Sequence, residues 1–366
     1  MDFSLIKGQD RVIKQLKNSL QNDKLSQSYL FYGPNGTGKL STALLFAMAI
    51  NCTSDITNKP CGVCNSCQKI MKFNHPDMLF IFPSTNLGMT KEGIIKSDKL
   101  REEYNSYIEH KIKQPWNNFY FSGNSEIRID VIRRLIEKIQ HSAFESEKKI
   151  FIVENVDKMG NNAANAFLKT LEEPPEDTII IILTISRDLL LDTITSRCKI
   201  IEFNKVSKKE IVNKLKDKYG LSDEKAEITA GYSKGNLYKA FKIYEGEDKV
   251  LEYRDKVSEI VDEIFEKGKI GIYEHEKYFN DNKDNIDEIL DVFMIWFRDV
   301  LFVKEDISDM IVNTDKLELL KKHSKCKNSI MVSQLQDVFQ ETYDDYNRNV
   351  NYNLIIENML SKIQEV

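Results

Sequence analysis

The sequence predicts an α/β domain with a parallel sheet covered by helices on both faces, followed by an all-helical half. Two observations carry this prediction. Short apolar, β-rich runs alternate with helical patterns through about the first 200 residues, as in sheets that are buried on both faces. All seven prolines lie at or before Pro175 and the last glycine is Gly271, so the C-terminal part has few residues that break helices.

The predicted strands are short and rich in β-branched and aromatic residues. They are Tyr29–Tyr32, Met78–Phe82, Ile150–Val153, Thr178–Thr184 and Ile200–Phe203. A polar segment from about Ser84 to Ser125 interrupts the alternation of strands and helices, which indicates an insertion. Aromatic residues lie near its end: Trp116, Phe119, Tyr120 and Phe121. They either pack on the parent domain or dock a partner, because aromatic side chains dominate both cores and interfaces.

The helical half carries apolar residues at three- and four-residue steps. One stripe consists of Ile286, Ile289, Leu290, Phe293, Trp296, Phe297, Val300 and Leu301. A second stripe consists of Leu335, Val338, Phe339 and Thr342. A ligand-binding face is the alternative, but this spacing favours the core of a helix bundle.

Composition excludes several classes of protein. The 366 residues carry a net charge of −5, so binding to DNA by bulk positive charge is not expected. The longest apolar run, Ala43 to Ile50, is far shorter than the roughly 20 residues of a membrane span, and no secretory signal opens the chain. We therefore expect a cytoplasmic protein without membrane contact, whose six cysteines are thiols or metal ligands.

A P-loop pattern follows the first predicted strand. Gly33-Pro-Asn-Gly-Thr-Gly-Lys39 matches the loop whose backbone N–H groups surround a phosphate while the lysine reaches its outer oxygens. The next residue is Leu40 where Ser or Thr would hold Mg²⁺, and Ser41 comes one place later. The candidate nucleotide-binding residues are Gly33, Gly36, Thr37, Gly38, Lys39, Leu40 and Ser41. A glycine-rich turn without a ligand is the alternative.

Four cysteines have the spacing of a metal site. Cys52 is followed by Cys61-Gly-Val-Cys64-Asn-Ser-Cys67. Four thiolates close a tetrahedral Zn²⁺ site and leave no open position, so such a site is structural. Free thiols or a redox pair are the alternatives.

These motifs together resemble one family. Ala163-Ala-Asn-Ala-Phe-Leu-Lys-Thr-Leu-Glu-Glu-Pro-Pro175, Thr195-Ser-Arg-Cys198 and His75-Pro-Asp77 accompany the P-loop and the cysteines. The set is similar to the bacterial DNA polymerase III clamp-loader subunits, which belong to the AAA+ ATPases. The resemblance covers roughly residues 1–245 apart from the insertion. The C-terminal third matches only in being helical and in its position.

The family includes an ATP-hydrolysing gamma/tau type and a non-hydrolysing delta-prime type. Active subunits carry Asp-Glu after a strand, where this chain has Glu154-Asn155, and a neutral amide cannot act as a general base. The lid arginine of active subunits corresponds to Tyr238 here. With Leu40, three letters of the hydrolytic machinery are absent, so the chain resembles the delta-prime type.

The resemblance implies a role for Arg197, within the intact Ser-Arg-Cys triplet. In the family this arginine projects into the ATP site of the neighbouring subunit, where it stabilises charge on the transferring phosphoryl group. It would be an arginine finger acting in trans. The alternative is an arginine at a helix end in a surface ion pair.

The resemblance also implies three domains. An AAA+ domain spans residues 1–203, with the zinc module at 52–67 and the insertion at about 84–125. A helical lid spans 204–248, and a helical collar that assembles with other subunits spans 249–366.

The expected function is to help load a sliding clamp onto primed DNA. The implied partners are the gamma/tau and delta subunits, the clamp and, through the assembled complex, DNA. The implied cofactors are structural Zn²⁺ and, at the P-loop, ATP or ADP. The alternatives are an active gamma/tau-like ATPase and an AAA+ adaptor outside the replisome.

Overall fold

The computed structural model describes residues 2–22, 24–54, 59–90, 94–113, 125–268, 272, 275–325, 329–348 and 350–365. The chain divides into two compact units, Met1–Ser207 and Lys208–Val366. The expected lid and collar fall together in the second unit, and the division into three domains stays a prediction. Among the described residues, no helix has the length and apolar content that crossing a membrane requires.

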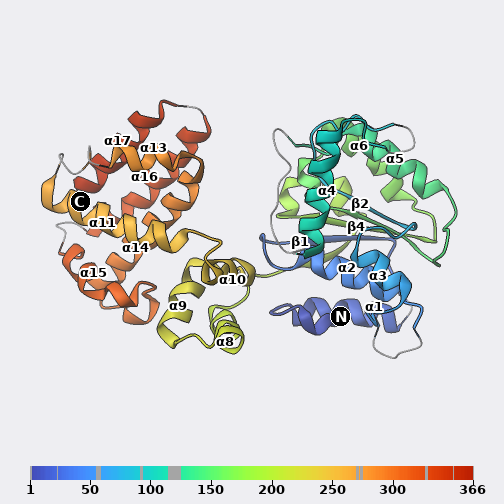
Figure 1. Ribbon diagram of the computed structural model, residues 1–366, viewed down its shortest axis with the longest axis horizontal. Coiled ribbons are helices and arrows are strands. Elements are labelled where there is room, and N and C mark those ends of the chain that lie inside the picture. Colours follow the sequence, from blue (N-terminus) through green and yellow to red (C-terminus); the bar gives the residue numbers. More distant parts are fainter. Residues whose placement is uncertain are drawn as a thin grey trace. The chain divides into compact units, whose positions relative to one another are not determined.

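The first unit is built on a parallel sheet (Figure 1). Its strands within the described residues are β1 Ser28–Tyr32, β2 Met78–Ile81, β3 Lys149–Val153, β4 Thr178–Thr184 and β5 Lys199–Glu202. Their order is β2-β3-β4-β1-β5, and every neighbouring pair is parallel. The predicted strands and their parallel arrangement are confirmed.

Helices cover both faces of this sheet (Figure 1). One face packs on α1 Asp10–Gln21, α2 Lys39–Ile50, α3 Asn65–Met71 and α4 Asp98–Lys113. The other face packs on α5 Ile129–Gln140, α6 Asn161–Glu172 and α7 Asp192–Thr195. Short 3-10 turns are η1 Phe3–Leu5, η2 Val156–Lys158 and η3 Arg187–Leu189. Because successive strand residues point to opposite faces, both faces need apolar side chains, which explains the unbroken apolar runs.

Helix α4 belongs to the segment expected as an insertion. This segment leaves the sheet region and returns to it at an antiparallel bridge between Ser84 and Glu126, whose backbone groups exchange two hydrogen bonds of 3.2 Å. Its aromatic end, Trp116 to Phe121, lies outside the described residues. The helix itself packs on the sheet through Tyr107, which stacks on Phe82 with ring centroids 4.0 Å apart.

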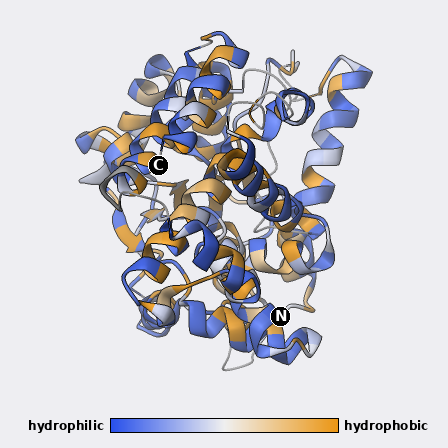
Figure 2. Ribbon diagram, turned by 90° about the vertical axis from the view of Figure 1, so that its left-hand side faces the viewer, coloured by the Kyte–Doolittle hydropathy of each residue, from blue (hydrophilic) through white to orange (hydrophobic). Residues whose placement is uncertain are grey.

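The regular structure among the described residues of the second unit is helical, as the lack of proline predicts. Its α-helices are α8 Lys208–Tyr219, α9 Asp223–Tyr232, α10 Leu237–Glu245, α11 Val250–Lys267, α13 Glu276–Asp281, α14 Ile286–Lys304, α15 Leu317–His323, α16 Ser329–Asn347 and α17 Tyr352–Gln364. Its 3-10 turns are η4 Lys283–Asn285, η5 Ser308–Met310 and η6 Thr314–Lys316. In Figure 2, hydrophilic and hydrophobic residues alternate along the helices, as expected where one face of a helix is buried.

The predicted apolar stripe lies on α14 and is buried in the bundle core. Trp296 is fully buried, and Phe293 and Phe297 pack on Phe339 of α16 with ring centroids 5.5 and 5.9 Å apart. The bundle-core interpretation is therefore confirmed. The stripe is used by the chain's own core and leaves no wide apolar face of α14 for another subunit.

A buried polar network joins α9 to the rest of the second unit. Tyr232 Oη donates to Asn313 Oδ1 at 2.9 Å, and Arg254 Nε donates to the same oxygen at 2.7 Å. Asp299 in turn accepts from the backbone N–H of Asn313 at 2.8 Å. A Cβ on Gly231 would lie 2.4 Å from Val312 Cγ1, so only glycine permits this approach. The three helices α8 to α10 are thus fixed to the bundle by contacts that few substitutions would preserve.

Candidate nucleotide site and metal centre

The P-loop connects β1 to α2, as its sequence predicts. Gly33 follows the last residue of β1 with a φ of 146°, and a Cβ there would lie 2.1 Å from the carbonyl oxygen of Phe203. Only glycine fits so close to a backbone atom. The loop is therefore held against the residue that follows β5, and it leads directly into the N-terminus of α2.

Lys39 lies across the loop and is bonded to it. Its Nζ donates to the carbonyl oxygens of Gly33 at 2.5 Å and of Pro34 at 2.9 Å. Thr37 Oγ1 also donates to Pro34, at 2.8 Å. Burial lowers the pKa of Lys39 to about 8, although the nearby carboxylates of Glu154 and Asp157 favour its charged form. The lysine is thus a partly buried cation whose charge is favoured by two nearby acidic groups.

The residues after Lys39 do not fit a Mg²⁺ ion. Leu40 is buried in the apolar core of the first unit and has no ligand atom. The hydroxyl of Ser41 is buried and makes no hydrogen bond with the described residues. A P-loop enzyme needs a hydroxyl on the metal at the position of Leu40. The structure therefore agrees with the sequence that this P-loop lacks the hydroxyl that binds Mg²⁺.

Glu154 and Asn155 follow β3 at the same edge of the sheet. Both carboxylate oxygens of Glu154 are engaged by α4: Lys111 Nζ lies 2.7 Å from Oε1 and Tyr107 Oη donates to Oε2 at 2.9 Å. Asn155 has a left-handed backbone with φ 51°, a conformation that asparagine tolerates better than most residues. The sequence placed Glu154 after a strand but did not indicate either donor, because nothing local in the sequence links α4 to β3.

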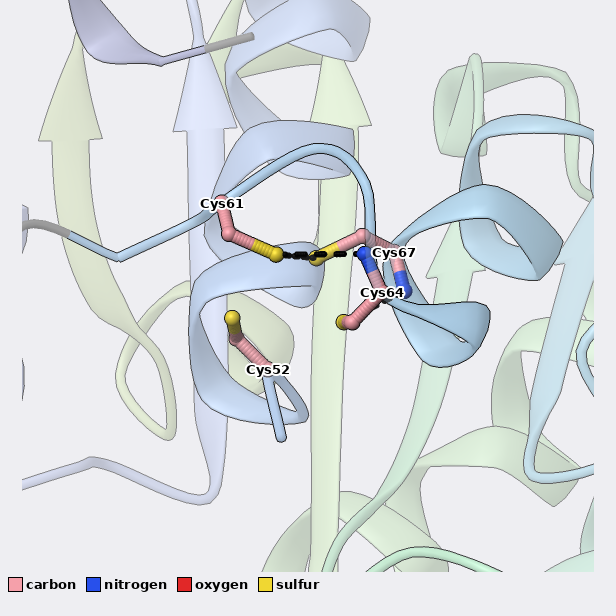
Figure 3. A group of neighbouring side chains, drawn as sticks. All are labelled: Cys52, Cys61, Cys64 and Cys67. Carbon is pink, nitrogen blue, oxygen red and sulfur yellow. Dashed lines mark hydrogen bonds between the residues drawn. The ribbon is translucent and has the colours of Figure 1, made fainter. Parts of the chain in front are cut away.

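The four predicted metal ligands come together (Figure 3). The sulfur atoms of Cys52, Cys61, Cys64 and Cys67 all lie within 4.8 Å of one another. Cys52 follows the end of α2, Cys61 and Cys64 precede α3, and Cys67 lies in its first turn. Four sulfurs at this separation could surround one metal ion, so the chemistry of the donor set fits a closed tetrahedral centre.

Backbone N–H groups point at two of these sulfurs. Cys64 N lies 3.2 Å and Val63 N 3.4 Å from Cys61 Sγ, and these donors lower the pKa of the Cys61 thiol. For Cys64, burial opposes ionisation, but the donors of Cys67 and Thr53 outweigh it and lower the pKa of the thiol to about 6. Burial raises the pKa of Cys67. The loop thus favours thiolates at two positions, and thiolate is the form that binds metal.

The His75-Pro-Asp77 motif supports the loop that precedes β3. The Asp77 carboxylate accepts three successive backbone N–H groups, from Phe144 at 2.5 Å, Glu145 at 2.8 Å and Ser146 at 2.9 Å. Burial disfavours its charge, yet these donors lower the pKa of Asp77. The buried ring of His75 lies 3.3 Å from the hydroxyl of Ser66, which adjoins Cys67. The motif therefore ties the cysteine module to the sheet.

Arg197 and Tyr238 are the remaining residues that the sequence singled out, and each is described within its own unit. Arg197 Nη2 pairs with Glu172 Oε1 at 2.7 Å, and its Nη1 donates to the carbonyl oxygen of Thr193 at 2.6 Å. Its side chain is 32% exposed, so in this chain it is a surface ion pair near a helix end. Tyr238 lies in the second unit, in the first turn of α10, where Asn236 Oδ1 accepts its backbone N–H at 3.0 Å.

Comparison with known proteins gives the family. The model described as DNA polymerase III, delta subunit matches residues 8–207, and the model of the C-terminal part of that subunit matches residues 251–365. The chain belongs to the DNA polymerase III delta subunit family. The resemblance to DNA polymerase III clamp-loader subunits, drawn from the P-loop, the cysteines and the Ser-Arg-Cys triplet, is confirmed. The parallel sheet and the helical second unit agree with the expected fold class.

Two curated relatives distinguish the subunit types within this family. The DNA polymerase III subunit delta' of Bacillus subtilis is 29% identical over 360 residues, which cover 98% of this chain and 96% of the relative. The subunit tau of the same organism is 27% identical over 325 residues, which cover 82% of this chain and 50% of the relative. The full-length match favours the delta-prime type over the gamma/tau alternative.

Two solved structures have more limited similarity to this chain. A gamma subunit-related protein from Thermotoga maritima is 20% identical, with a TM-score of 0.42, over 96% of this chain and 99% of that one. The Bacillus subtilis clamp loader delta protein is 12% identical, with a TM-score of 0.31, over 96% of this chain and 99% of that one.

Proposed function

We propose that this chain is a delta-prime-like subunit of a bacterial replicative clamp loader. The observation that carries the proposal is the family match over both the α/β part and the helical part of the chain. In this role the chain would act in the cytoplasm with gamma/tau and delta partners. The complex would open a sliding clamp and place it on primed DNA.

We further propose that the chain does not hydrolyse ATP itself. Three features support this: Leu40 is part of the apolar core, Glu154 is engaged by two donors from α4, and Asn155 replaces a general base. ATP or ADP stays a proposed ligand of the loop from Gly33 to Lys39. The chemistry would occur in neighbouring subunits, with Arg197 supplied in trans.

The four cysteines are proposed to hold one structural Zn²⁺. When bound, the ion would cross-link the end of α2 to the start of α3. With four protein ligands the ion has no free coordination position, so it would supply no catalysis. Its proposed role is to stabilise the connection between α2 and the short helix α3.

Reconstitution tests the main proposal. The chain is combined with gamma/tau and delta subunits, and clamp loading on primed DNA is measured together with ATP turnover by the chain alone. We expect the complex to load clamps only when the chain is present, and the isolated chain to show no turnover near 1 s⁻¹, the low end of typical enzyme rates.

Two outcomes would contradict this assignment. Turnover by the isolated chain that Lys39→Ala abolishes would establish an active gamma/tau-like ATPase. Failure to bind either partner in a pull-down would favour an adaptor that works outside the replisome.

A further inference from the structure

The insertion helix α4 places a buried ammonium on the carboxylate at the end of β3. Lys111 Nζ lies 2.7 Å from Glu154 Oε1, and the Lys111 side chain is 2% exposed while that of Glu154 is 12% exposed. Tyr107 Oη donates to the other oxygen, Oε2, at 2.9 Å. Lys111 Nζ also lies 5.4 Å from the centroid of the Tyr107 ring, within range of a cation–π contact. Each oxygen of this carboxylate thereby has a donor from a single helix turn, and one of the two donors is a cation.

This carboxylate lies in the P-loop region. Glu154 directly follows β3, and the charges of Glu154, Asp157 and Lys111 all act on the partly buried ammonium of Lys39. In P-loop ATPases the carboxylate that follows this strand supports Mg²⁺, together with the hydroxyl after the P-loop lysine. Here the hydroxyl is replaced by Leu40, and the carboxylate already has a cation.

A divalent ion and the ammonium of Lys111 compete for the same oxygen. Both are positive, so they repel strongly at the separation that one carboxylate imposes, and burial weakens the screening of that repulsion. Removing either partner from a buried ion pair leaves an uncompensated charge. A divalent ion is therefore not expected to displace Lys111 from Glu154, because the site offers that ion few other ligands.

We propose that Lys111 is a tethered counter-cation that takes the place of Mg²⁺ at Glu154 and closes this nucleotide site to divalent cations. The inference deepens the non-hydrolysing part of the proposed function and rests on it. The insertion would then determine which ligands the site accepts. Lys39 and the loop could still bind an anion, but a divalent cation for a metal-assisted reaction would have no place at Glu154.

The test uses the isolated full chain and Mn²⁺ alone as the probe. Lys111→Gln removes the charge and keeps a donor for Glu154. We expect its melting temperature to fall by roughly 5 °C or more, because Glu154 is left buried without a cation. Millimolar Mn²⁺ should restore most of this loss and should leave the wild type unchanged. Electron paramagnetic resonance of free Mn²⁺ should show about one additional bound ion in Lys111→Gln.

Two controls separate this result from general effects. The double variant with Lys111→Gln and Glu154→Gln should bind no additional Mn²⁺, because the carboxylate is gone. Lys149→Gln removes another buried lysine, which lies 3.2 Å from the partly exposed Asp177, and its stability should fall without recovery in Mn²⁺. Among the described residues, Lys149 Nζ donates to the carbonyl oxygens of Ile139 and His141, and it is not among the charges that act on Lys39.

The proposal is overturned by either of two results. One is that Mn²⁺ stabilises the wild type as much as Lys111→Gln. The other is that folded Lys111→Gln binds no additional Mn²⁺, in which case Lys111 is only a structural partner. Should Lys111→Gln fail to fold without metal, it is refolded in Mn²⁺. Recovery of folded protein then supports the proposal, and failure in both conditions contradicts it. Clamp loading is not measured, so these outcomes are independent of the test of the proposed function.

Discussion

Arg197 forms a weak surface ion pair with Glu172 in this chain. Its pair with Glu172 is half exposed, and exposed ion pairs contribute about 0–1 kcal/mol. The surface ion pair that sequence reasoning weighed as an alternative is thus present in the isolated chain, and it does not prevent a role at a subunit interface. A guanidinium can exchange one carboxylate for a phosphate oxygen, because both accept its paired N–H donors.

We predict that Arg197→Ala lowers clamp loading by the reconstituted complex by roughly tenfold or more, because one ATP site loses its charge stabiliser. The free energy of unfolding of the isolated chain should change by less than about 1 kcal/mol. Glu172→Gln is the matched control: it breaks the same ion pair, keeps the arginine and should load clamps normally. Equal loading by wild type and Arg197→Ala would show that the arginine is only structural.

His323 predicts a pH dependence of stability in the second unit. Trp296 Nε1 donates to His323 Nδ1 at 3.1 Å, so Nδ1 must be unprotonated, and Nε2 lies 3.0 Å from Asp262 as the donor. Burial lowers the pKa of His323, although Asp262 favours the charged ring. The unfolded chain therefore binds the proton more readily, and stability is lost as the pH falls below about 6.5.

The measurement is thermal unfolding between pH 7.5 and pH 5, compared for wild type and His323→Asn. The variant keeps an acceptor for Trp296 and has no titrating ring, so its stability should fall less steeply with falling pH. His75 and His275 also have lowered pKa values and remain in both proteins, so only the difference is assigned to His323. Parallel slopes for the two proteins would refute the assignment.

At the scale of elements, the cysteine module links the end of α2 to the start of α3, two helices that also pack in the same core. The described residues 51–54 and 59–64 lie outside helices and strands, so a metal would add stability there. The four sulfurs meet because α2 ends beside the N-terminus of α3, which is a consequence of packing on the sheet.

We predict about one Zn²⁺ per chain in protein purified without chelator, by metal analysis. Cys64→Ser should lose most of this zinc and lower the melting temperature of the first unit. Cys198→Ser is the control, because Cys198 is buried among apolar side chains outside the cluster. Zinc near zero in wild-type protein, with the four thiols titratable in the native state, would exclude the metal centre.

At the scale of the whole molecule, the chain consists of two units with separate cores. The helices α8 to α10 belong to the second unit because Tyr232 and Gly231 contact Asn313 and Val312. A chain shortened to end within the second unit, before residue 312, lacks Val312 and Asn313. A chain that ends between the two units contains neither α8 to α10 nor these contacts.

We predict that a chain ending at residue 207 unfolds cooperatively and keeps its zinc, because its core is complete. A chain ending at residue 248 should contain the same folded unit but expose α8 to α10 to limited proteolysis, since Asn313 and Arg254 are gone. The full chain is the control. Equal protection of α8 to α10 in the shortened and full chains would show that these three helices fold alone.

The sequence by itself determined the strands, the parallel sheet, the helical second half, the P-loop and the four cysteines. These features depend on residue spacing along a short stretch, because the periods of strands and helices and the turn of a glycine loop are local. The family followed from the same local motifs. Tertiary structure alone decided that Lys111 and Tyr107 bind Glu154, more than 40 residues away, and that Arg197 pairs with Glu172. Such partners are chosen by burial, since a charge removed from water must take whichever opposite charge the fold brings within reach, and sequence spacing does not specify that choice.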